Sequence, residues 1–510
     1  MTLSELIQKL KGQLMETNKE AHLAFANEPI STEVPTELDL EASERLKAFL
    51  SKTDPPAAPE VLAHREAVLS DLRTLLDEFV AEAARQQPGF DEEAPLPKGL
   101  LLPFGSYQLG VVNDESDIDV VCILPRFITR KRFFTQFAQL VESNPKTKNL
   151  CRIEEAFVPI VTLNFDGIDI DLSCAIIDYD SVGDDIDFAD NDLITNIDKL
   201  SVRSLNGWRT NDLILKLVPD KDSFTLLLRF LRVWARKRGI YGNMYGYFGG
   251  INLALLSAYI CQLYPVASPA MLVFMFFTVF SEYKWPKPVF INHPFEGTAH
   301  PSWEFIAETE LMPIITPAYP SMNSMRKATH STINRISEEC AKAMDAVGRV
   351  LTEMKPWSEV VPSTSFFVKY KRFIEIILTA DSPTAMMWWQ GNIEARLRKL
   401  ALNLESQDLI IGAYPFPTTF EQKGDGRKTI RSMFVAINYK LAGNGGNKLD
   451  ISNPVKNFVQ MIIQLEGRTS EMLIDVKLVD RKNLPACVYP NGVRPASHSS
   501  HSLKKGPKKK

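Results

Sequence analysis

The chain has 510 residues, of which 45% are apolar and 24% charged. These values are typical of soluble globular proteins, exclude a largely disordered, collagen-like or repeat-built chain, and at roughly one domain per 150 residues predict about three domains. Fifty-eight basic and 62 acidic residues give a formal net charge of -4. Binding to nucleic acid or to an anionic membrane must therefore come from local patches rather than from overall charge.

The six cysteines lie far apart and form neither a C-x-x-C pair nor a zinc-finger spacing. We expect most of them to be free, buried thiols in a reducing compartment. The first 20 residues are amphipathic and charged, without the apolar centre of a signal peptide. The longest apolar run, residues 270–280, is about half as long as a membrane span requires. The sequence therefore predicts neither secretion nor insertion into a membrane.

Residues 1–59 are interpreted as an N-terminal helix followed by a connector, because residues 28–60 are rich in Pro, Thr, Ser and Glu. A long helix is predicted over residues 60–86. Three short β-rich runs follow, VVCILP, FVPIVTLNF and IDIDLSCAII, each bounded by turn residues. Residues 60–211 are therefore expected to form a mixed α/β domain.

Residues 212–362 are expected to form a helical domain, interrupted by the glycine-rich segment 241–250, with further helices at 271–280 and 331–354. Residues 363–486 read strand, helix, strand, strand, helix, strand, the order of the split βαβ unit in ferredoxin-like and RNA-recognition folds. Residues 487–510 end in SLKKGPKKK, whose five lysines cannot form a packed element. This tail is interpreted as a solvated tail, a nuclear-import signal or a nonspecific RNA-binding tail.

The clearest chemical signal is the turn Gly105-Ser106, followed by Asp117 and Asp119 at the start of an apolar run. In a strand, residues two apart point to the same side, so the two carboxylates should lie together while Ile118 enters the core. Paired carboxylates suit Mg²⁺ or Mn²⁺. The backbone N–H groups and the hydroxyl of the turn suit a phosphate. The pattern therefore favours a metal-bound nucleotide over a simple solvent-facing strand end.

A second pair, Asp169 and Asp171, has the same i, i+2 spacing on a later strand. One of them could complete a three-carboxylate metal site, but the spacing does not choose between them, and a hairpin with polar outer residues fits equally well. Three arginines, Arg229, Arg232 and Arg236, fall on one helical face, which suits either a triphosphate or solvent. The acidic run 178–192 begins like a calcium loop but lacks ligands at its fifth and twelfth positions, so it is interpreted as a solvated loop.

Two segments, PFGSYQLGVVNDESDIDVVCILP and IDIDLSCA, resemble the polymerase-β-like nucleotidyltransferases. Further segments are similar to the eukaryotic nuclear poly(A) polymerases, among them RSLNGWRTNDLILKLVP, ICQLYP, KWPKPV and LMPIITPAYPSM. The resemblance runs from about residue 60 to residue 485. The turn and D-x-D pattern is shared by the whole superfamily, whereas LNGWRTNDLIL and ITPAYPSM are specific to this branch.

The resemblance implies an α/β multidomain fold, with a nucleotidyltransferase domain at 60–211, a helical central domain at 212–362, an RRM-like βαββαβ RNA-binding domain at 363–486 and a basic tail at 487–510. It also implies that Asp117, Asp119 and Asp171 are catalytic and hold two Mg²⁺ or Mn²⁺ ions, and that Asp169 does not. The residues implied to bind ATP, the expected substrate, are Phe104, Gly105, Ser106, Asn206, Arg232, Tyr241, Asn243, Gly250 and Ile251.

The residues implied to bind RNA are Phe157, Thr162 and Arg398. Taken alone, a Phe in a β-rich run is more often a core residue, and Arg398 with its neighbours reads as an exposed helical face. Two positions depart from the family, because similar sequences have lysine where Arg232 and Thr162 stand. Arg232 keeps the charge but changes its geometry, and Thr162 removes a lysine near the primer end.

The resemblance therefore predicts a poly(A) polymerase that transfers AMP from ATP to the 3′-hydroxyl of mRNA by a two-metal mechanism and releases pyrophosphate. The expected partners are the RNA 3′ end and the mRNA cleavage and polyadenylation machinery, in the nucleus and without a membrane. A transferase specific for another nucleotide, such as a uridylyltransferase, and a noncatalytic RNA-binding scaffold are the alternatives.

Overall fold

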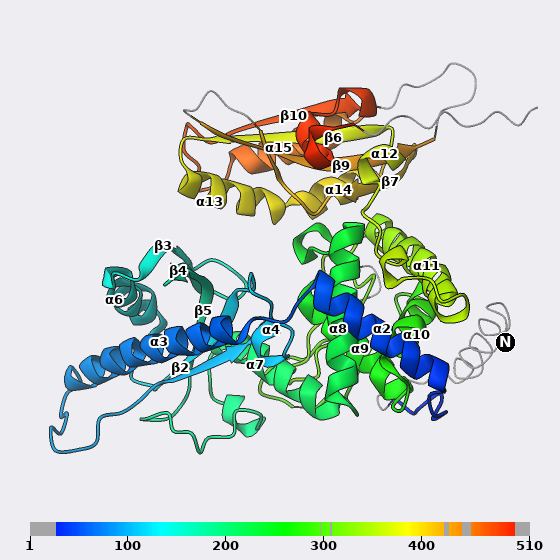
Figure 1. Ribbon diagram of the computed structural model, residues 1–510. Helices are drawn as coiled ribbons and strands as arrows, with labels where there is room; N and C mark the ends of the chain where they lie inside the picture. The colour runs from blue at the N-terminus through cyan, green and yellow to red at the C-terminus, as the bar shows by residue number, and fades with distance from the viewer. Residues whose placement is uncertain (1–26, 296, 307–308, 423–427, 441–449, 495–510) are drawn as a thin grey trace, which may run out of the picture. The chain divides into compact units, whose positions relative to one another are not determined.

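The computed structural model describes residues 27–295, 297–306, 309–422, 428–440 and 450–494. The predicted N-terminal helix within residues 1–20 and the lysine-rich end of the tail lie outside these residues. The chain divides into two compact units, one up to Ser363 and one from Thr364 onward. The first unit contains both the mixed α/β segment and the helical segment (Figure 1).

The first unit is built around a five-stranded mixed sheet in the order β1-β2-β5-β4-β3. Its strands are β1 Leu100–Phe104, β2 Ile118–Leu124, β3 Thr147–Ile153, β4 Ile160–Phe165 and β5 Ile168–Ile176. The strands β2 and β5 are parallel, and the other neighbours are antiparallel. The three β-rich runs predicted from sequence are confirmed as β2, β4 and β5, whereas β1 and β3 were not expected.

The two faces of this sheet pack against different helices because side chains alternate along each strand. Ile118, Val120 and Cys122 share one core with α3 (Pro59–Arg85) and with the helical stretch α5 (Arg130–Arg132), η1 (Phe133–Phe137) and α6 (Ala138–Ser143). Val121 and Ile123 share the other core with α7 (Lys199–Leu217). The odd-numbered carboxylates of β2 and β5 therefore project to the side of α7.

A helix that the sequence analysis missed, α2 (Glu37–Thr53), lies inside the expected connector. Its N-cap Thr36 accepts a hydrogen bond from the Asp39 N–H, and the Asp39 side chain accepts one from the Thr36 N–H, which makes a capping box. Leu46 and Leu50 are fully buried, and α2 packs against α10. The connector interpretation is wrong for this stretch because its prolines flank the helix rather than interrupt it.

The predicted helical segment of the first unit is confirmed by α8 Lys221–Arg238, α9 Gly250–Leu263, α10 Pro269–Ser281 and α11 His330–Thr352. A short helix, α4 Gly105–Gln108, follows β1. The long helix predicted at 60–86 is confirmed as α3. The helix α8 ends at Gly239, whose left-handed backbone (φ 65°) stops the helix before the glycine-rich segment.

The second unit is a five-stranded antiparallel sheet with helices, and it confirms the predicted strand-helix-strand-strand-helix-strand order. Its elements are α12 Phe366–Lys369, β6 Arg372–Ala380, α13 Pro383–Glu394, α14 Leu397–Glu405, β7 Ile410–Pro415, β8 Phe420–Gln422, β9 Thr429–Tyr439, α15 Ser452–Ile463 and β10 Leu473–Asp480. The strand order β10-β6-β9-β7, with the added β8 on β9, is that of a ferredoxin-like or RRM-like fold.

The cysteines are free, and four of the six are buried: Cys122, Cys174, Cys261 and Cys340. This matches the expectation of buried thiols. Among the described residues, we find no helix with the length and apolarity needed to cross a membrane.

Candidate functional site

The glycine-serine turn joins the end of β1 to α4 and approaches the carboxylates closely. Gly105 has a left-handed backbone (φ 64°), and a Cβ atom there would lie 2.1 Å from Asp119 Oδ2. No residue other than glycine fits at this position without moving the carboxylate. Asn211 of α7 holds the turn in place, because its Nδ2 donates to the Gly105 carbonyl at 2.9 Å.

Phe104 and Ser106 flank this glycine. The Phe104 ring rests on Gly207 of α7, where a Cβ atom would lie 2.6 Å from Phe104 Cε2. The Ser106 carbonyl accepts a hydrogen bond from the Val111 N–H at 3.1 Å, which closes the loop after α4. The helix α7 therefore holds the turn at both Phe104 and Gly105, next to the carboxylates.

The three predicted catalytic carboxylates converge on two parallel strands. Asp119 of β2 lies directly opposite Asp171 of β5, and Asp117 precedes β2 by one residue. Burial, followed by repulsion from Asp117 and Asp171, raises the pKa of Asp119 to about 7. Burial, followed by repulsion from Asp117 and Asp169, raises the pKa of Asp171 to about 6. Three acids this close are therefore stable at neutral pH only when a proton or a cation offsets their charge.

The fit of a metal to these residues rests on donor chemistry and electrostatics. Carboxylate oxygens are the hard ligands that Mg²⁺ and Mn²⁺ prefer, and burial, together with repulsion between the carboxylates, raises the pKa values of Asp119 and Asp171. Within the described ranges, the side chains do not form a group of three His, Cys, Asp or Glu positioned to hold one ion. The residues therefore fit a divalent cation by type and charge, and their side chains would have to move to bind one.

Asp169 differs from Asp171 in its surroundings. Asp169 is exposed and lies opposite Asn164 of β4, whose Nδ2 donates to Asp169 Oδ1 at 2.8 Å. Asp171 is half-buried and lies between Asp119 and Thr162, which is its partner on β4. The two aspartates therefore have different surroundings, which their spacing in the sequence did not reveal. Thr162 lies beside the carboxylates.

The loop that carries Asp117 is held by a buried arginine that the sequence analysis did not single out. Arg65 of α3 is only 1% exposed, and its Nη2 donates to the backbone carbonyls of Asn113 at 3.2 Å and of Ser116. Its pKa is lowered by burial, against the attraction of Asp117 and Asp114. The sequence offered one signal for the role of Arg65, because it is a charged residue within the apolar stripe of α3, four residues before the buried Leu69.

The predicted triphosphate arginine, Arg232, is buried rather than solvent-facing. Its Nη1 donates to the Val111 carbonyl in the loop after α4, and it also bonds the Tyr241 side chain. Burial lowers its pKa, and nearby Arg236 lowers it further, while Tyr241 and Asp54 oppose the shift. Arg232 therefore lies between the loop of the glycine-serine turn and Tyr241.

The other two arginines of this helix have different surroundings. Arg229 bonds the Asp54 carbonyl, and its Nε lies 3.6 Å from Asp54 Oδ2. The Arg236 guanidinium lies 5.0 Å from the centroid of the Tyr241 ring and is exposed. Arg229 therefore ties α8 to the residue that follows α2, while Arg236 remains at the surface.

The remaining residues implied to bind the nucleotide gather at the start of α9. A Cβ atom on Gly250 would lie 3.4 Å from the Tyr241 hydroxyl, so the two are neighbours. Asn243 Nδ2 donates to Asn252 Oδ1 and to the Ser324 carbonyl, each at 3.1 Å. Ile251 is half-buried in the first turn of α9, which contacts α4. The structure thus brings these residues close to the turn.

Asn206 is fully buried on α7 and bonded at both ends of its amide. Arg209 Nη1 donates to its Oδ1 at 3.1 Å, and its Nδ2 donates to the Pro320 carbonyl at 3.3 Å. These bonds use one of the two N–H donors and one of the two acceptor positions of the amide, so one of each remains for a ligand.

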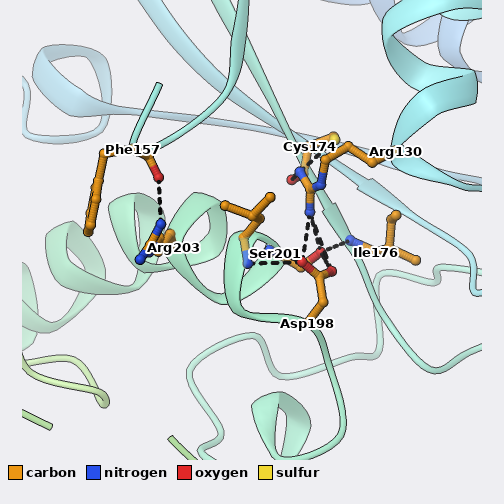
Figure 2. A network of polar contacts seen from close by, with 8 residues as sticks. Arg130, Phe157, Cys174, Ile176, Asp198, Ser201 and Arg203 are labelled. Atoms are coloured by element: carbon orange, nitrogen blue, oxygen red, sulfur yellow. Dashed lines mark hydrogen bonds and ion pairs between the residues drawn. The ribbon is translucent and has the colours of Figure 1, made fainter. Parts of the chain in front are cut away.

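Phe157 is 49% exposed and lies beside α7 rather than in the core. The Arg203 guanidinium lies 3.9 Å from its ring centroid, and Arg203 Nη1 donates to its carbonyl at 3.2 Å (Figure 2). Both residues line an open groove of about 320 Å³, together with Lys199, Asn206, His300 and Arg326. Arg203, which the sequence analysis missed, covers one face of Phe157.

A buried polar network anchors the start of α7 to the sheet (Figure 2). Arg130 donates to the Cys174 carbonyl at 3.2 Å, to Asp198 Oδ1 at 3.2 Å and to Ser201 Oγ at 2.9 Å. Asp198 is the N-cap of α7, and hydrogen bonds from Ser201 together with Arg130 lower its pKa against the effect of burial. The network fixes the helix that carries Arg203, Asn206 and Asn211.

Arg398 lies on α14 of the second unit and is half-buried. The interpretation of its surroundings as an exposed face is correct for Lys399 only, because Arg396 is half-buried and donates to the Asn392 carbonyl at 2.9 Å.

In the acidic run 178–192, Asp178 and Asp180 are exposed and pair with Arg126. This agrees with a solvated loop.

Three family descriptions together match most of the chain. Residues 26–218 match the poly(A) polymerase nucleotidyltransferase domain, residues 223–363 the poly(A) polymerase central domain, and residues 365–429 and 424–497 the poly(A) polymerase predicted RNA binding domain.

Curated relatives agree with these matches. The chain is 33% identical to a poly(A) polymerase of Dictyostelium discoideum over 91% of its length, and 33% identical to nuclear poly(A) polymerase 1 of Arabidopsis thaliana over 93%. It spans 59% and 67% of these two relatives. Among solved structures, a Cid1 RNA terminal uridylyl transferase matches 64% of the chain and 99% of its own, at 15% identity and a TM-score of 0.44.

Proposed function

Because the chain belongs to the poly(A) polymerase family, we propose that it adds AMP from ATP to the 3′-hydroxyl of RNA without a template and releases pyrophosphate. The observation that carries this proposal is the alignment of Asp119 with Asp171 on parallel strands, against the turn at Gly105. The proposal concerns the chain as given, which spans 59% of the Dictyostelium relative.

In this proposal Asp117, Asp119 and Asp171 hold two divalent ions, Mg²⁺ or Mn²⁺. When bound, such ions would lower the pKa of the RNA 3′-hydroxyl and neutralise charge on the departing pyrophosphate. The charge balance favours them, because burial and the neighbouring carboxylates raise the pKa of Asp119 to about 7 and that of Asp171 to about 6.

The chain's own residues would bind and orient ATP. The turn offers the N–H groups of Gly105 and Ser106 to phosphate oxygens. Arg232 uses one guanidinium N–H for the Val111 carbonyl, and its charge interacts with the Tyr241 side chain. A guanidinium has five N–H donors, so we propose that the others bind the triphosphate. Its contact with the loop after the turn supports this role.

Tyr241, Asn243, Gly250 and Ile251 would bind the base and sugar. The closeness of Gly250 to the Tyr241 hydroxyl supports one shared surface for these residues. In the RNA strand, the 3′-terminal base would stack on the ring face of Phe157 that Arg203 leaves uncovered. Thr162 would lie near the primer end, and Asn206 would bind ATP. Arg398 would contact RNA from the second unit.

We also propose roles for the segments: catalysis for residues 60–211, nucleotide binding with residues 212–362, and RNA binding for residues 363–486. The Arabidopsis relatives are named nuclear poly(A) polymerases, which supports a nuclear location and work on mRNA beside the cleavage and polyadenylation machinery. Deleting residues 502–510 and following nuclear accumulation tests the import role of the lysine tail.

Extension of a short oligo(A) primer, with each of the four nucleotides and with Mg²⁺ or Mn²⁺, tests the proposed activity. We expect ATP to be incorporated preferentially and activity to vanish in chelator. Preferential use of UTP would support the other transferase. Absence of metal-dependent extension in the folded protein would favour a noncatalytic scaffold.

A further inference from the structure

The sheet of the second unit cannot bind RNA as a typical RRM does, because the chain itself covers the face with the aromatic side chains. Phe373 of β6 and Phe434 of β9 are buried in a cluster with Phe366 of α12 and with Val488 and Tyr489 of the C-terminal turns. Phe373 and Phe434 are 0% and 1% exposed. Base stacking on this face would require the cluster to open, so RNA must use another surface of this unit.

Cations gather instead at one end of the same sheet. The strand β6 begins at Arg372, which pairs with Asp480 at the end of β10 and with Ile437 near the end of β9. The Arg481 N–H donates to the Lys371 carbonyl at 2.9 Å, so the two chain segments continue side by side. We define the cationic end as the set of five residues Lys371, Arg372, Lys440, Arg481 and Lys482.

The cationic end carries a net positive charge. Lys371, Lys440, Arg481 and Lys482 are exposed. Asp480 accepts from Arg372 Nε at 3.2 Å and can offset only one of the five charges. Arg372 is also fixed by Tyr439, with its guanidinium 5.4 Å from the ring centroid. Five cations from three separate segments thus occupy one end of the sheet.

We propose that the cationic end binds the phosphate backbone of single-stranded RNA that extends beyond the short 3′ segment needed for catalysis. The proposal rests on the proposed function and specifies where the second unit grips the strand. Exposed Lys and Arg side chains bind phosphates without reading sequence. An acidic protein segment would also present negative charge. RNA is favoured because it supplies one phosphate per nucleotide along the strand, which matches cations that are spread over three segments.

Salt dependence of RNA binding by the full chain tests this. We compare wild type with the pair Lys371→Gln and Lys482→Gln, using a labelled oligo(A) long enough to exceed the primer. Each phosphate contact in single-stranded nucleic acid contributes about 0.7 to the slope of log K against log salt concentration. The pair should therefore lower the slope by about 1.4 and weaken binding on the order of tenfold at 0.1 M salt.

A matched control removes two lysines elsewhere in the same unit, Lys428→Gln with Lys456→Gln. Lys428 pairs with Glu471 at 3.2 Å, and Lys456 is exposed on α15. The control should keep the wild-type slope. A second pair, Lys440→Gln with Lys482→Gln, should reproduce the loss, and Lys371→Arg with Lys482→Arg should restore the slope.

The failure of this proposal can be told apart from failure of the proposed function. The proposal would be overturned if both pairs and the control had the same slope. It would also be overturned if the pairs lost binding to a poly-glutamate peptide while their RNA binding was unchanged. Turnover on a saturating short primer should be the same in the pair and in wild type. If wild type itself does not extend primers, the proposed function fails, while the slope comparison still decides where RNA binds.

Discussion

Asp171 is the residue at which the geometry makes the sharpest prediction. Asp171→Asn should preserve the fold, because the amide is nearly isosteric, while removing one negative charge opposite Asp119. We expect turnover to fall by at least roughly two to three orders of magnitude, which is the usual cost of removing one key electrostatic group. Primer extension with ATP measures the loss, and thermal unfolding verifies the fold.

Asp169→Asn is the matched control for this prediction, since it lies two residues away on the same strand. Asp169 is exposed and hydrogen-bonded to Asn164, away from Asp119. We expect a mild effect on turnover. If both variants were equally inactive, the assignment of Asp171 alone as the third carboxylate would be wrong.

The raised pKa values of Asp119 and Asp171 predict an unusual pH dependence for the metal-free protein. A folded-state pKa of about 7 for Asp119, against an ordinary value of 3.8, means that the native state binds more protons than the unfolded state between these limits. Stability should therefore fall as pH rises from about 4 to 7, by a few kcal/mol at most, and this contribution should then change little up to pH 8.

Thermal unfolding in chelator over this pH range measures the effect. Asp119→Asn should flatten the dependence and be more stable than wild type at pH 8. Added Mg²⁺ should stabilise the wild type more at pH 8 than at pH 5.5, because protons occupy the carboxylates at the lower pH. A wild type whose stability depends on pH between 5.5 and 8 as little as that of the variant would contradict the electrostatic account.

Arg232 combines a structural bond with the proposed triphosphate contact. Arg232→Lys should keep a positive charge near Tyr241 but lose the fork that also reaches the Val111 carbonyl. We expect a raised ATP KM and a modest drop in kcat, with a larger drop in both for Arg232→Ala, since charge-assisted bonds are worth about 1.5–3 kcal/mol. Steady-state kinetics on a saturating primer decide. Unchanged ATP KM in the alanine variant would remove Arg232 from the nucleotide site.

At the scale of elements, the position of α7 depends on Arg130. Its guanidinium joins the Cys174 carbonyl of β5 to the N-cap Asp198 and to Ser201, and its side chain is 18% exposed. Arg130→Met should lower the free energy of unfolding by about 1–3 kcal/mol, because it removes the donor to the buried Ser201 hydroxyl and to the Cys174 carbonyl, whereas Asp198 is half exposed. Urea unfolding measures this.

Arg126→Met provides the contrast. Arg126 pairs with Asp178 and Asp180, but its side chain is 53% exposed, so its loss should leave stability nearly unchanged. If Arg130→Met were as mild as Arg126→Met, α7 would be held by its apolar face alone, without the polar network.

The elements that the sequence predicted well are those with strong periodicity. The helix α3 and the strands β2, β4 and β5 follow directly from their apolar patterns. The helix α2 was missed because proline-rich flanks resemble a linker, although Leu46 and Leu50 mark its buried face. A sequence pattern reveals a helix or strand when the apolar residues of that element repeat with its period. The pattern fails when a short element depends on contacts with residues that are distant in the sequence.

The candidate site shows the same limit. Paired carboxylates and the glycine turn are local in sequence, so spacing alone was enough to propose Asp117 and Asp119 as candidates. The supporting residues are not local: Arg65 reaches the loop before Asp117 from 48 residues away, and Asn211 reaches Gly105 from 106 residues away. Such contacts depend on the packing of α3 and α7, which a single sequence does not reveal.

For the whole molecule, the separation of its cores has a consequence for function. The cores on the two faces of the first unit's sheet draw their residues from the chain before Ser363, and the aromatic cluster of the second unit draws its residues from the chain after it. Each unit therefore buries its own apolar surface. All residues proposed for catalysis and nucleotide binding lie in the first unit.

A fragment of residues 1–363 should therefore fold by itself and, at saturating short primer, retain ATP turnover within about tenfold of the full chain. Its KM for long RNA should rise, because the fragment lacks the cationic end and Arg398, and its salt slope should fall by more than in the double lysine variants. Circular dichroism and urea unfolding report the fold, and primer titrations at two RNA lengths report the KM. An unfolded fragment would show that the first unit depends on the second for stability. A folded fragment whose KM for long RNA matches that of the full chain would place the RNA grip entirely in the first unit.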